Sequence, residues 1–242
     1  MFKTKKKILI TGGSGALGSS IKKFVNCYAP DSKELDVTNF KKCVKTVDIY
    51  NPDIIIHCAG WTNVVGAEKD RNKCWLVNVL GTQNMVQASA GKRFIFISTH
   101  YVFDGTRGNY KETDTPNPVN FYSLTKLIGE AIVGQYSNTL IVRTGFKKDG
   151  LWEYKKAFID QWTCADFASE RAPDIVRAAL MTKLMGVIHI SGKRKTVYDL
   201  ARRVSPGVGK MSINDTLVKL PRDVSLDSTK WKKIITSYNE KK

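Results

Sequence analysis

Tyr122 and Lys126 are the residues whose types and spacing first indicate chemistry. They stand at i and i+4 in YSLTK, so on a helix both side chains share one face. An ammonium group beside a phenol favours phenolate and lowers the tyrosine pKa, which suits proton exchange near neutral pH. Ser98 and Thr99 end the preceding apolar run, and their hydroxyls can hydrogen-bond a carbonyl oxygen. These four residues predict proton transfer at a substrate oxygen.

A glycine-rich turn follows the first apolar run of the chain. Residues 6–11 (KKILIT) predict a buried strand, and residues 15–24 predict the helix after it. Gly12, Gly15 and Gly18 connect the two at GxxGxxG spacing. Such a turn directs backbone N–H groups and the positive end of the helix at a pyrophosphate. This context favours a dinucleotide site over a merely flexible turn.

The residues after the second expected strand, 27–29, concern the adenosine ribose of such a cofactor. Asp31 is the candidate carboxylate for the ribose hydroxyls, although it lies closer to the glycines than the usual ~20 residues. Ser32 and Lys33 follow and can hold a 2′-phosphate. The sequence therefore leaves both NADH and NADPH open as the cofactor.

Strands and helices alternate along most of the chain, which predicts an α/β fold with a doubly wound parallel sheet of the Rossmann type. Besides the elements above, strands are expected at 34–37, 54–56, 93–98, 139–144 and 187–191, with helices at about 39–50, 70–89, 121–136 and 174–182. We predict a dinucleotide-binding domain over residues 1–145, to which 172–192 return. Residues 146–242 are expected to form a small substrate-binding lobe.

Composition limits the function further. The 242 residues are 42% hydrophobic, but no run reaches the ~18 apolar residues that a membrane span needs. Five cysteines without a CxxC pair, and three isolated histidines, predict neither disulfides nor a metal site and favour the cytoplasm. The net charge of +17 attracts phosphorylated molecules, but basic residues are spread along the chain and predict no specific nucleic-acid groove.

Several longer motifs occur in order along residues 6–145. They are TGGSGALG, ELDVTN, PDIIIHCAGWTNVVGAE, VNVLGTQN, FISTHYVFDG, YSLTK and IVRTG, with DQWTCADFASERAPDIVRAAL and LPRDVSLDSTKW further on. Together they resemble the extended short-chain dehydrogenases/reductases, and among these the dTDP-4-dehydrorhamnose reductase family. The resemblance implies NAD(P)H-dependent reduction of a 4-keto-6-deoxy sugar that is attached to a nucleoside diphosphate.

The resemblance also implies roles for matching residues. Thr99 would orient the ketone oxygen, Tyr122 would donate the proton, and Lys126 would hold the ribose hydroxyls. In addition to Asp31, Ser32, Tyr122 and Lys126, the expected cofactor contacts are Gly12, Gly15, Ala16, Leu17, Gly18, Asp36, Val37, Cys58, Ala59, Gly60, Thr62 and Ser98. The expected substrate contacts are Thr62, His100, Tyr101, Phe103, Trp162 and Arg222.

The chain differs from the family pattern at several points. His100 and Val65 stand where aspartates are usual, and the stretch from Arg143 to Asp160 is shorter. Two alternatives therefore accompany the reductase reading: a nucleotide-sugar epimerase or dehydratase of the same fold, and a non-catalytic NAD(P)-binding regulatory subunit. The resemblance also allows a homodimer formed through the helices that flank Tyr122.

Overall fold

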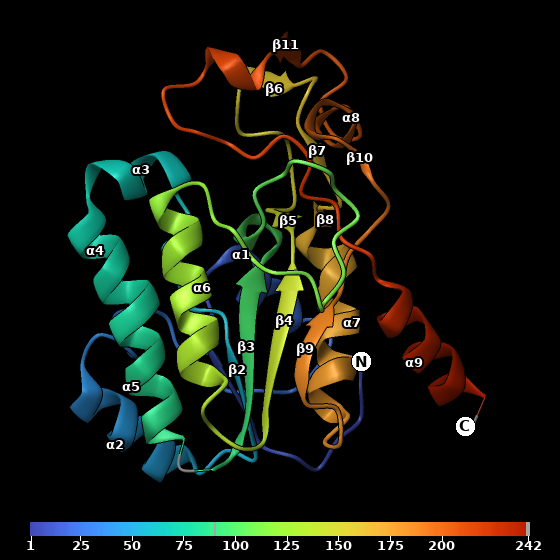
Figure 1. Ribbon diagram of the computed structural model, residues 1–242. Coiled ribbons are helices and arrows are strands. Elements are labelled where there is room, and N and C mark those ends of the chain that lie inside the picture. The colour runs from blue at the N-terminus through green and yellow to red at the C-terminus, as the bar shows by residue number, and fades with distance from the viewer. Residues whose placement is uncertain (90, 241–242) are drawn as a thin grey trace.

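A five-stranded parallel sheet lies between two layers of helices in the computed structural model, which describes residues 1–89 and 91–240 (Figure 1). In order across the sheet, the strands are β1 (Ile8–Thr11), β2 (Ile54–His57), β3 (Arg93–Thr99), β4 (Thr139–Thr144) and β9 (Gly186–His189). Every neighbouring pair is parallel. The predicted α/β fold with its parallel sheet is confirmed.

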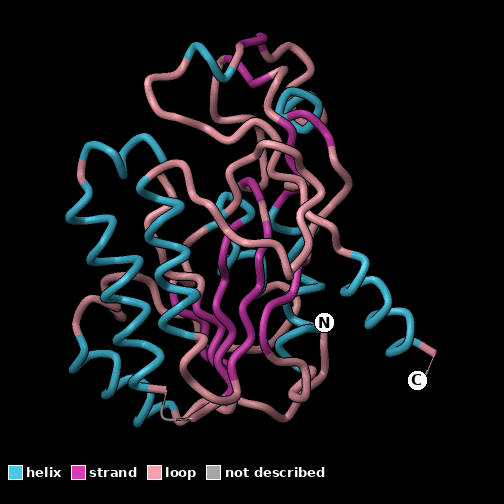
Figure 2. The backbone as a smooth tube through the Cα atoms, in the orientation of Figure 1, coloured by secondary structure: helices cyan, strands magenta, loops and turns pink. Residues whose placement is uncertain are grey.

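Alternating side chains of the strands explain why helices cover both faces of the sheet. Ile8 and Ile10 share one apolar cluster with α1 (Ala16–Ile21) and α7 (Ala168–Leu180), whereas Leu9 belongs to the cluster on the opposite face. The opposite face is covered by α2 (Phe40–Tyr50), α5 (Gly81–Ala88) and α6 (Phe121–Val133). An unbroken apolar run thus buries two rows of side chains at once. Figure 2 shows the strands enclosed by helices.

Side-chain caps set where several helices begin. Asn63 caps α3 (Val64–Lys69), and Asp70 caps α4 (Arg71–Trp75), which continues through the π-helical η1 (Leu76–Leu80) into α5. Asn120 accepts hydrogen bonds from the backbone N–H and the hydroxyl of Ser123 and so starts α6. Because of this cap, the first turn of α6 presents Tyr122 at the end of the sheet.

The short strands expected at 27–29 and 34–37 are not part of the sheet in the described chain. Tyr28 makes only an isolated bridge with Leu9. The next residues form turns, because the Asp31 carboxylate accepts hydrogen bonds from the N–H groups of Lys33 and Glu34. These turns bring the chain from the glycine loop to α2 without a strand.

Residues 146–167 and 193–228 build most of a small lobe beyond the carboxyl ends of β3 and β4 (Figure 1). Its strand pairs are β5 (Phe146–Lys147) with β8 (Asp166–Phe167), β7 (Trp162–Thr163) with β10 (Lys195–Thr196), and β6 (Lys156–Phe158) with β11 (Gly209–Met211). Two further elements are α8 (Val197–Arg202) and the 3-10 turn η3 (Ile213–Asp215). The pairs are only two or three residues long, so they depend on the surrounding packing.

The last helix, α9 (Thr229–Asn239), lies outside the lobe in which we expected it. It packs against β9, and Figure 1 shows it beside the sheet. Trp231 is 4% exposed and belongs to the same apolar cluster as β1, while Ile234 and Ile235 pack against that cluster. These apolar side chains share one face of the helix, which explains its position.

The described residues contain no metal-ligating group and no membrane-spanning element. No three histidine, cysteine, aspartate or glutamate side chains among them gather as a metal ion would require. None of their helices is both long enough and apolar enough to cross a bilayer.

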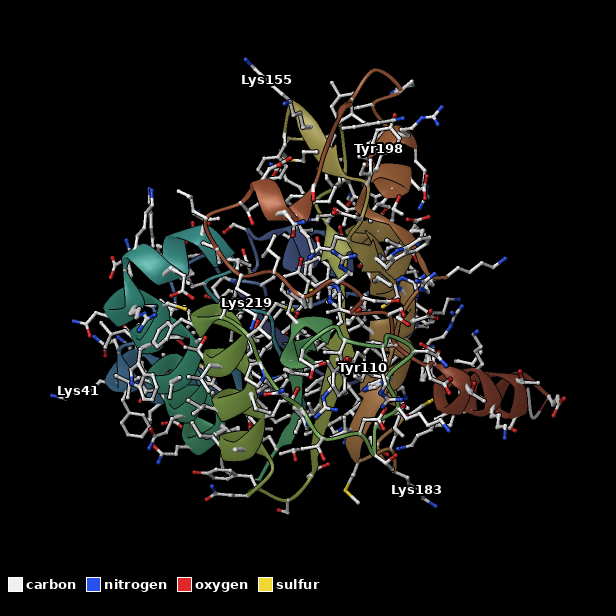
Figure 3. All side chains as sticks on the ribbon, turned by 45° about the horizontal axis from the view of Figure 1, so that its top comes forward. Lys41, Tyr110, Lys155, Lys183, Tyr198 and Lys219 are labelled. Atoms are coloured by element: carbon white, nitrogen blue, oxygen red, sulfur yellow. The ribbon has the colours of Figure 1, made fainter. Side chains whose placement is uncertain are left out.

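Figure 3 shows Lys41, Lys155 and Lys183 extending from separate parts of the molecule. Positive charge is thus distributed over several surfaces.

Candidate active site

A cavity of about 390 Å³ lies where the lobe meets the sheet. Its wall combines the start of α1, the loop after β2, the ends of β3 and β4, the first turns of α6, and the lobe. Ligands of parallel α/β sheets bind at these strand ends. The predicted site residues that line it are Ala16, Leu17, Cys58, Gly60, Thr62, Ser98, Thr99, His100, Tyr101, Tyr122 and Lys126.

The glycine turn is closely folded against its neighbours. Gly12 has φ +68°, and a Cβ at this position would come within 2.8 Å of the backbone nitrogen of Ala59. A Cβ on Gly18 would collide with the carbonyl oxygen of Gly12. The N–H of Gly15 donates to that same oxygen over 3.0 Å and closes the turn. The backbone before α1 therefore carries no side chain that would keep a phosphate away.

Lys126 carries a buried charge that lacks a hydrogen-bond acceptor among the described residues. Its side chain is on α6, only 6% of the residue is exposed, and the ammonium lies 4.1 Å from the centre of the Phe96 ring. Burial lowers the pKa of Lys126 to about 8, although the nearby Glu130 carboxylate opposes the shift. A buried cation of this kind is costly unless a ligand supplies acceptors. Lys126 therefore fits the hydroxyls of a cofactor ribose.

The pKa of Tyr122 is raised, whereas the sequence led us to expect that Lys126 lowers it. Burial raises the pKa of Tyr122 to about 12, while a hydrogen bond with Thr99 lowers it and only partly offsets the burial. Lys126 is not among the causes of the shift, so the side chains on one helix face do not act as the spacing suggested. The phenol accordingly keeps its proton at neutral pH, the state that a proton donor requires.

Thr99 has a fixed hydroxyl at the end of β3. Its Oγ1 accepts a hydrogen bond from the backbone N–H of Tyr101 at 3.2 Å, and the same hydroxyl forms the hydrogen bond with Tyr122 described above. Ser98, which precedes it, instead donates to the Glu130 carboxylate. Both hydroxyls were candidates for a ligand, and of the two only Thr99 is hydrogen-bonded to the Tyr122 phenol.

Arg143 is likewise unavailable to a ligand. Both Nε and Nη2 of its guanidinium donate to Glu130. Arg143 and Glu130 are 4% and 5% exposed, so their pair lies in the interior behind Ser98. The role of Arg143 is therefore to neutralise a buried carboxylate.

His100 lines the cavity and links the sheet to the lobe. Its Nδ1 lies 3.1 Å from the carbonyl oxygen of Thr144, and its Nε2 lies 3.1 Å from Thr163 Oγ1. A carbonyl only accepts, so Nδ1 carries the proton and Nε2 accepts from Thr163. Burial lowers the pKa of His100 to about 4, so the ring is neutral at neutral pH. His100 thus holds β7 against the end of β3.

Asn78 positions the loop beside Lys126. Its side chain accepts a hydrogen bond from the N–H of Trp61 at 2.7 Å and donates to Thr125 Oγ1 at 2.9 Å. Asn78 lies in η1, where the helix locally widens, and it is 1% exposed. The loop that contains Gly60 is therefore fixed to α6, which also carries Lys126.

Three expected substrate contacts lie outside the cavity wall. Phe103 is completely buried, and its ring stacks on Tyr110 with centroids 4.2 Å apart. Trp162 lies under the Arg194 guanidinium, 3.7 Å from the ring centroid. Arg222 is exposed, and its carbonyl oxygen accepts from the backbone N–H of Trp162. Phe103 is thus a core residue, and Trp162 and the backbone of Arg222 contribute to the assembly of the lobe.

Several expected cofactor contacts surround the glycine turn outside the cavity. Asp31 lies next to it, because the N–H of Gly13 donates to the carbonyl of Pro30. Hydrogen bonds from Glu34 and Lys33 lower the pKa of Asp31, and Ser32 is exposed on the same turn. Four further positions have internal roles: Asp36 accepts from Thr38, Val37 packs against Gly81, Ala59 donates to Thr11, and Gly15 caps α1.

The lobe supplies cavity residues that the sequence did not indicate. They include Phe146, Lys147, Lys148, Glu153 and Tyr154. The segment after Gly145 has no regular apolar period, so nothing in it showed which side chains would face the sheet. The one available signal was the lysine pair that directly follows the apolar strand in IVRTGFKK.

A parallel sheet with a glycine turn, together with Thr99, Tyr122 and Lys126 at one cavity, defines the class of short-chain dehydrogenases/reductases. Within it, the family model described as the RmlD substrate binding domain matches residues 6–158. The chain belongs to this family, as the motifs predicted.

Individual relatives and solved structures agree with this assignment. The chain is 31% identical to dTDP-4-dehydrorhamnose reductase of Aggregatibacter actinomycetemcomitans over 192 residues, which are 75% of this chain and 60% of that protein. It is 32% identical to methionine adenosyltransferase 2 subunit beta of Xenopus tropicalis over 142 residues, which are 53% and 42%. The chain thus spans about 60% or less of the length of these relatives.

The fold also matches a solved structure over its whole length. The crystal structure of dTDP-4-dehydrorhamnose reductase from Bacillus anthracis str. Ames in complex with NADP superposes with a TM-score of 0.85 and 25% identity. The match covers 99% of this chain and 100% of that one.

Proposed function

We propose that this protein is an NAD(P)H-dependent reductase of a 4-keto-6-deoxy sugar attached to a nucleoside diphosphate. The observation that carries the proposal is the meeting of Thr99, Tyr122 and Lys126 in one cavity beside the glycine turn. Two of the similar proteins are named dTDP-4-dehydrorhamnose reductase, and one of them was solved with NADP. These names support the same substrate class and cofactor for this chain.

The residues present fit a dinucleotide. The glycine turn offers the bare backbone that a pyrophosphate needs, and the Lys126 ammonium offers hydrogen bonds that no described residue accepts. Asp31 and Ser32 would hold the adenosine ribose, while Lys33 beside them can meet a 2′-phosphate. When bound, NADPH or NADH supplies the hydride for the ketone carbon.

The chain's own residues supply the proton and the positioning. Thr99 donates a hydrogen bond that places the ketone oxygen, and the protonated Tyr122 delivers its proton to that oxygen as negative charge develops there. Lys147 and Lys148 bring positive charge from the lobe to the same cavity, where a diphosphate needs it.

Cofactor oxidation tests the proposal directly. Purified protein is mixed with NADPH or NADH and with several 4-keto nucleotide sugars, and the loss of nicotinamide absorbance is followed. Tyr122→Phe should abolish this loss while NADPH affinity stays within about twofold, because only the proton donor is removed. Normal turnover by Tyr122→Phe would show that the assigned mechanism is wrong.

A non-catalytic NADP-binding subunit is the second candidate. It is favoured by the similarity to methionine adenosyltransferase 2 subunit beta of Xenopus tropicalis, which extends over 142 residues. This reading predicts that NADPH binds but is not consumed with any of the sugars. An epimerase or dehydratase would instead convert the sugar without net loss of nicotinamide absorbance.

The proposal includes three finer expectations. Residues 1–145 with 172–192 would bind the cofactor and 146–242 the substrate, with α9 as the exception noted above.

A homodimer would form through the helices flanking Tyr122, where Trp75 and Leu124 are 42% and 40% exposed. The protein would act in the cytoplasm. Sedimentation equilibrium of the wild type and Leu124→Lys tests the dimer, because a charge in an apolar interface should give monomers.

A further inference from the structure

The hydroxyl of Tyr101 forms a hydrogen bond with a side chain of the lobe, Gln161. Tyr101 follows Thr99 by two residues in η2 (His100–Val102), and its side chain lines the cavity. It packs against the apolar cluster that contains Tyr122, so both phenols border the same space. Its oxygen receives a hydrogen bond from Gln161 of the lobe at 3.0 Å.

The Gln161 side chain can act only as a donor in this contact. Its Nε2 lies 3.0 Å from the carbonyl oxygen of Pro221 and 3.0 Å from the Tyr101 hydroxyl. A carbonyl oxygen only accepts, so the amide nitrogen must face it, and the same nitrogen uses its second hydrogen on Tyr101. The Tyr101 oxygen therefore accepts, and its own proton must point away from Gln161.

The surroundings hold Gln161 in this orientation. Gln161 is 1% exposed. Its backbone carbonyl oxygen accepts a hydrogen bond from the N–H of Val197 at the start of α8. The next residue, Trp162, donates its N–H to Arg222, directly after Pro221. Backbone hydrogen bonds within the lobe thus hold both Gln161 and Trp162 in place.

The proton of the Tyr101 hydroxyl has no acceptor among the residues that the structure describes. A buried hydroxyl normally uses its proton in a hydrogen bond. The ring forms part of the cavity wall, so the open direction for this proton is the cavity.

We propose that Gln161 is a positioning residue that fixes the Tyr101 hydroxyl as a hydrogen-bond donor to an oxygen atom of the sugar. This inference rests on the proposed function for the identity of the ligand. It gives the lobe a direct part in substrate selection, because a lobe side chain decides which way the Tyr101 hydroxyl in η2 points. A sugar without an acceptor oxygen at this place leaves the donor unpaired and is rejected.

The kinetic test compares Tyr101→Phe, Gln161→Met and the double variant with the wild type, using the 4-keto nucleotide sugar that the wild type reduces fastest. Tyr101→Phe should lower kcat/KM by roughly ten- to thirtyfold, the loss expected for one hydrogen bond, with NADPH affinity unchanged within about twofold. Gln161→Met should lower kcat/KM when it is introduced into the wild type. Introduced into Tyr101→Phe, the same substitution should change kcat/KM by less than about twofold. Gln135→Met, at an exposed glutamine, is the matched control.

Two kinetic results would overturn the inference. One is a Tyr101→Phe variant whose kcat/KM stays within about twofold of the wild type. The other is an equal loss from Gln161→Met in both backgrounds, because a residue that only stabilises the lobe acts whether or not Tyr101 has its hydroxyl. Gln161→Glu adds a second probe, since a carboxylate accepts the Tyr101 proton and should lower kcat/KM at least as much as Gln161→Met.

A binding measurement separates this inference from the proposed function. If the wild type oxidises NADPH with none of the sugars, the proposed reductase activity fails. The donor is then judged by calorimetry with dTDP-glucose and NADP-saturated protein. Roughly tenfold weaker binding to Tyr101→Phe than to the wild type supports the donor. Equal affinities, or no binding to the wild type, overturn it.

Discussion

The Arg143 guanidinium and the Glu130 carboxylate form a two-pronged ion pair behind the cavity, with Nη2 2.7 Å from Oε2. Their side chains are 5% and 6% exposed. Ser98, at the end of β3, donates to the same carboxylate, so Glu130 connects α6 with two strands of the sheet. The pair therefore supports the elements that carry Thr99 and Tyr122.

Glu130→Gln should lower the free energy of unfolding by about 3–5 kcal/mol, because it leaves the buried Arg143 without a counter-charge. Urea unfolding followed by circular dichroism measures the loss. Replacing both partners in Glu130→Leu/Arg143→Met should cost less than Glu130→Gln alone, since no buried charge then remains. A double variant less stable than the single one would contradict this account.

Gly18→Ala should weaken NADPH binding at least about tenfold and lower stability by about 1–3 kcal/mol, because the added methyl group collides with the carbonyl oxygen of Gly12. Fluorescence titration with NADPH and urea unfolding give the two quantities. Gly207→Ala is the control, since a Cβ there meets no atom within 4 Å. Normal NADPH affinity in Gly18→Ala would show that the turn is not the pyrophosphate site.

The parts of the fold that the sequence predicted well are those with a local pattern. The apolar run before Gly12 and the helix after it needed only residues within about two turns of each other. The Tyr122–Lys126 spacing and its place after β3 were equally local. Half of the predicted site residues line one cavity.

The parts that could not be predicted depend on contacts between distant residues. β5 pairs with β8, which lies about 20 residues later, and each strand has only two residues, too few for a period. Phe103 follows the catalytic strand as a ligand residue would, but stacking on Tyr110 places it in the core. The raised pKa of Tyr122 depends on burial, which the spacing of Tyr122 and Lys126 does not encode.

Lys126→Met should make the protein more stable while it weakens NADPH binding. Because burial lowers the pKa of Lys126 to about 8 from the 10.5 of a free lysine, the folded state disfavours the ammonium form. This penalty is absent above pH 10.5 and complete below pH 8, where it amounts to up to about 3 kcal/mol. Urea unfolding at about pH 7 should show a gain of roughly 1–3 kcal/mol.

The same variant should lose about tenfold or more in NADPH affinity, since the ammonium no longer meets the ribose hydroxyls. Lys41→Met, on the exposed side of α2, should change neither quantity. A Lys126→Met protein that is less stable than the wild type would mean that the buried charge has an internal partner.

Acidification from about pH 7.5 to pH 5 should destabilise the protein through its three buried histidines. Burial lowers the pKa of His57 to about 3 and those of His100 and His189 to about 4, against 6.5 in the unfolded chain. All are neutral in both states above pH 6.5, so their penalty begins there and grows as pH falls toward the folded pKa. At pH 5 it is about 2 kcal/mol for each histidine.

This pH dependence can be assigned to single residues by comparing a histidine variant with the wild type, because all other titrating groups are the same in both. His100→Gln removes one of the three buried histidines. Between pH 7.5 and pH 5, the free energy of unfolding should therefore decrease in this variant by about 2 kcal/mol less than in the wild type. Urea unfolding at both pH values measures the difference. An unchanged pH slope in His100→Gln would mean that His100 is already protonated between Thr144 and Thr163, and the assigned hydrogen-bond directions would be wrong.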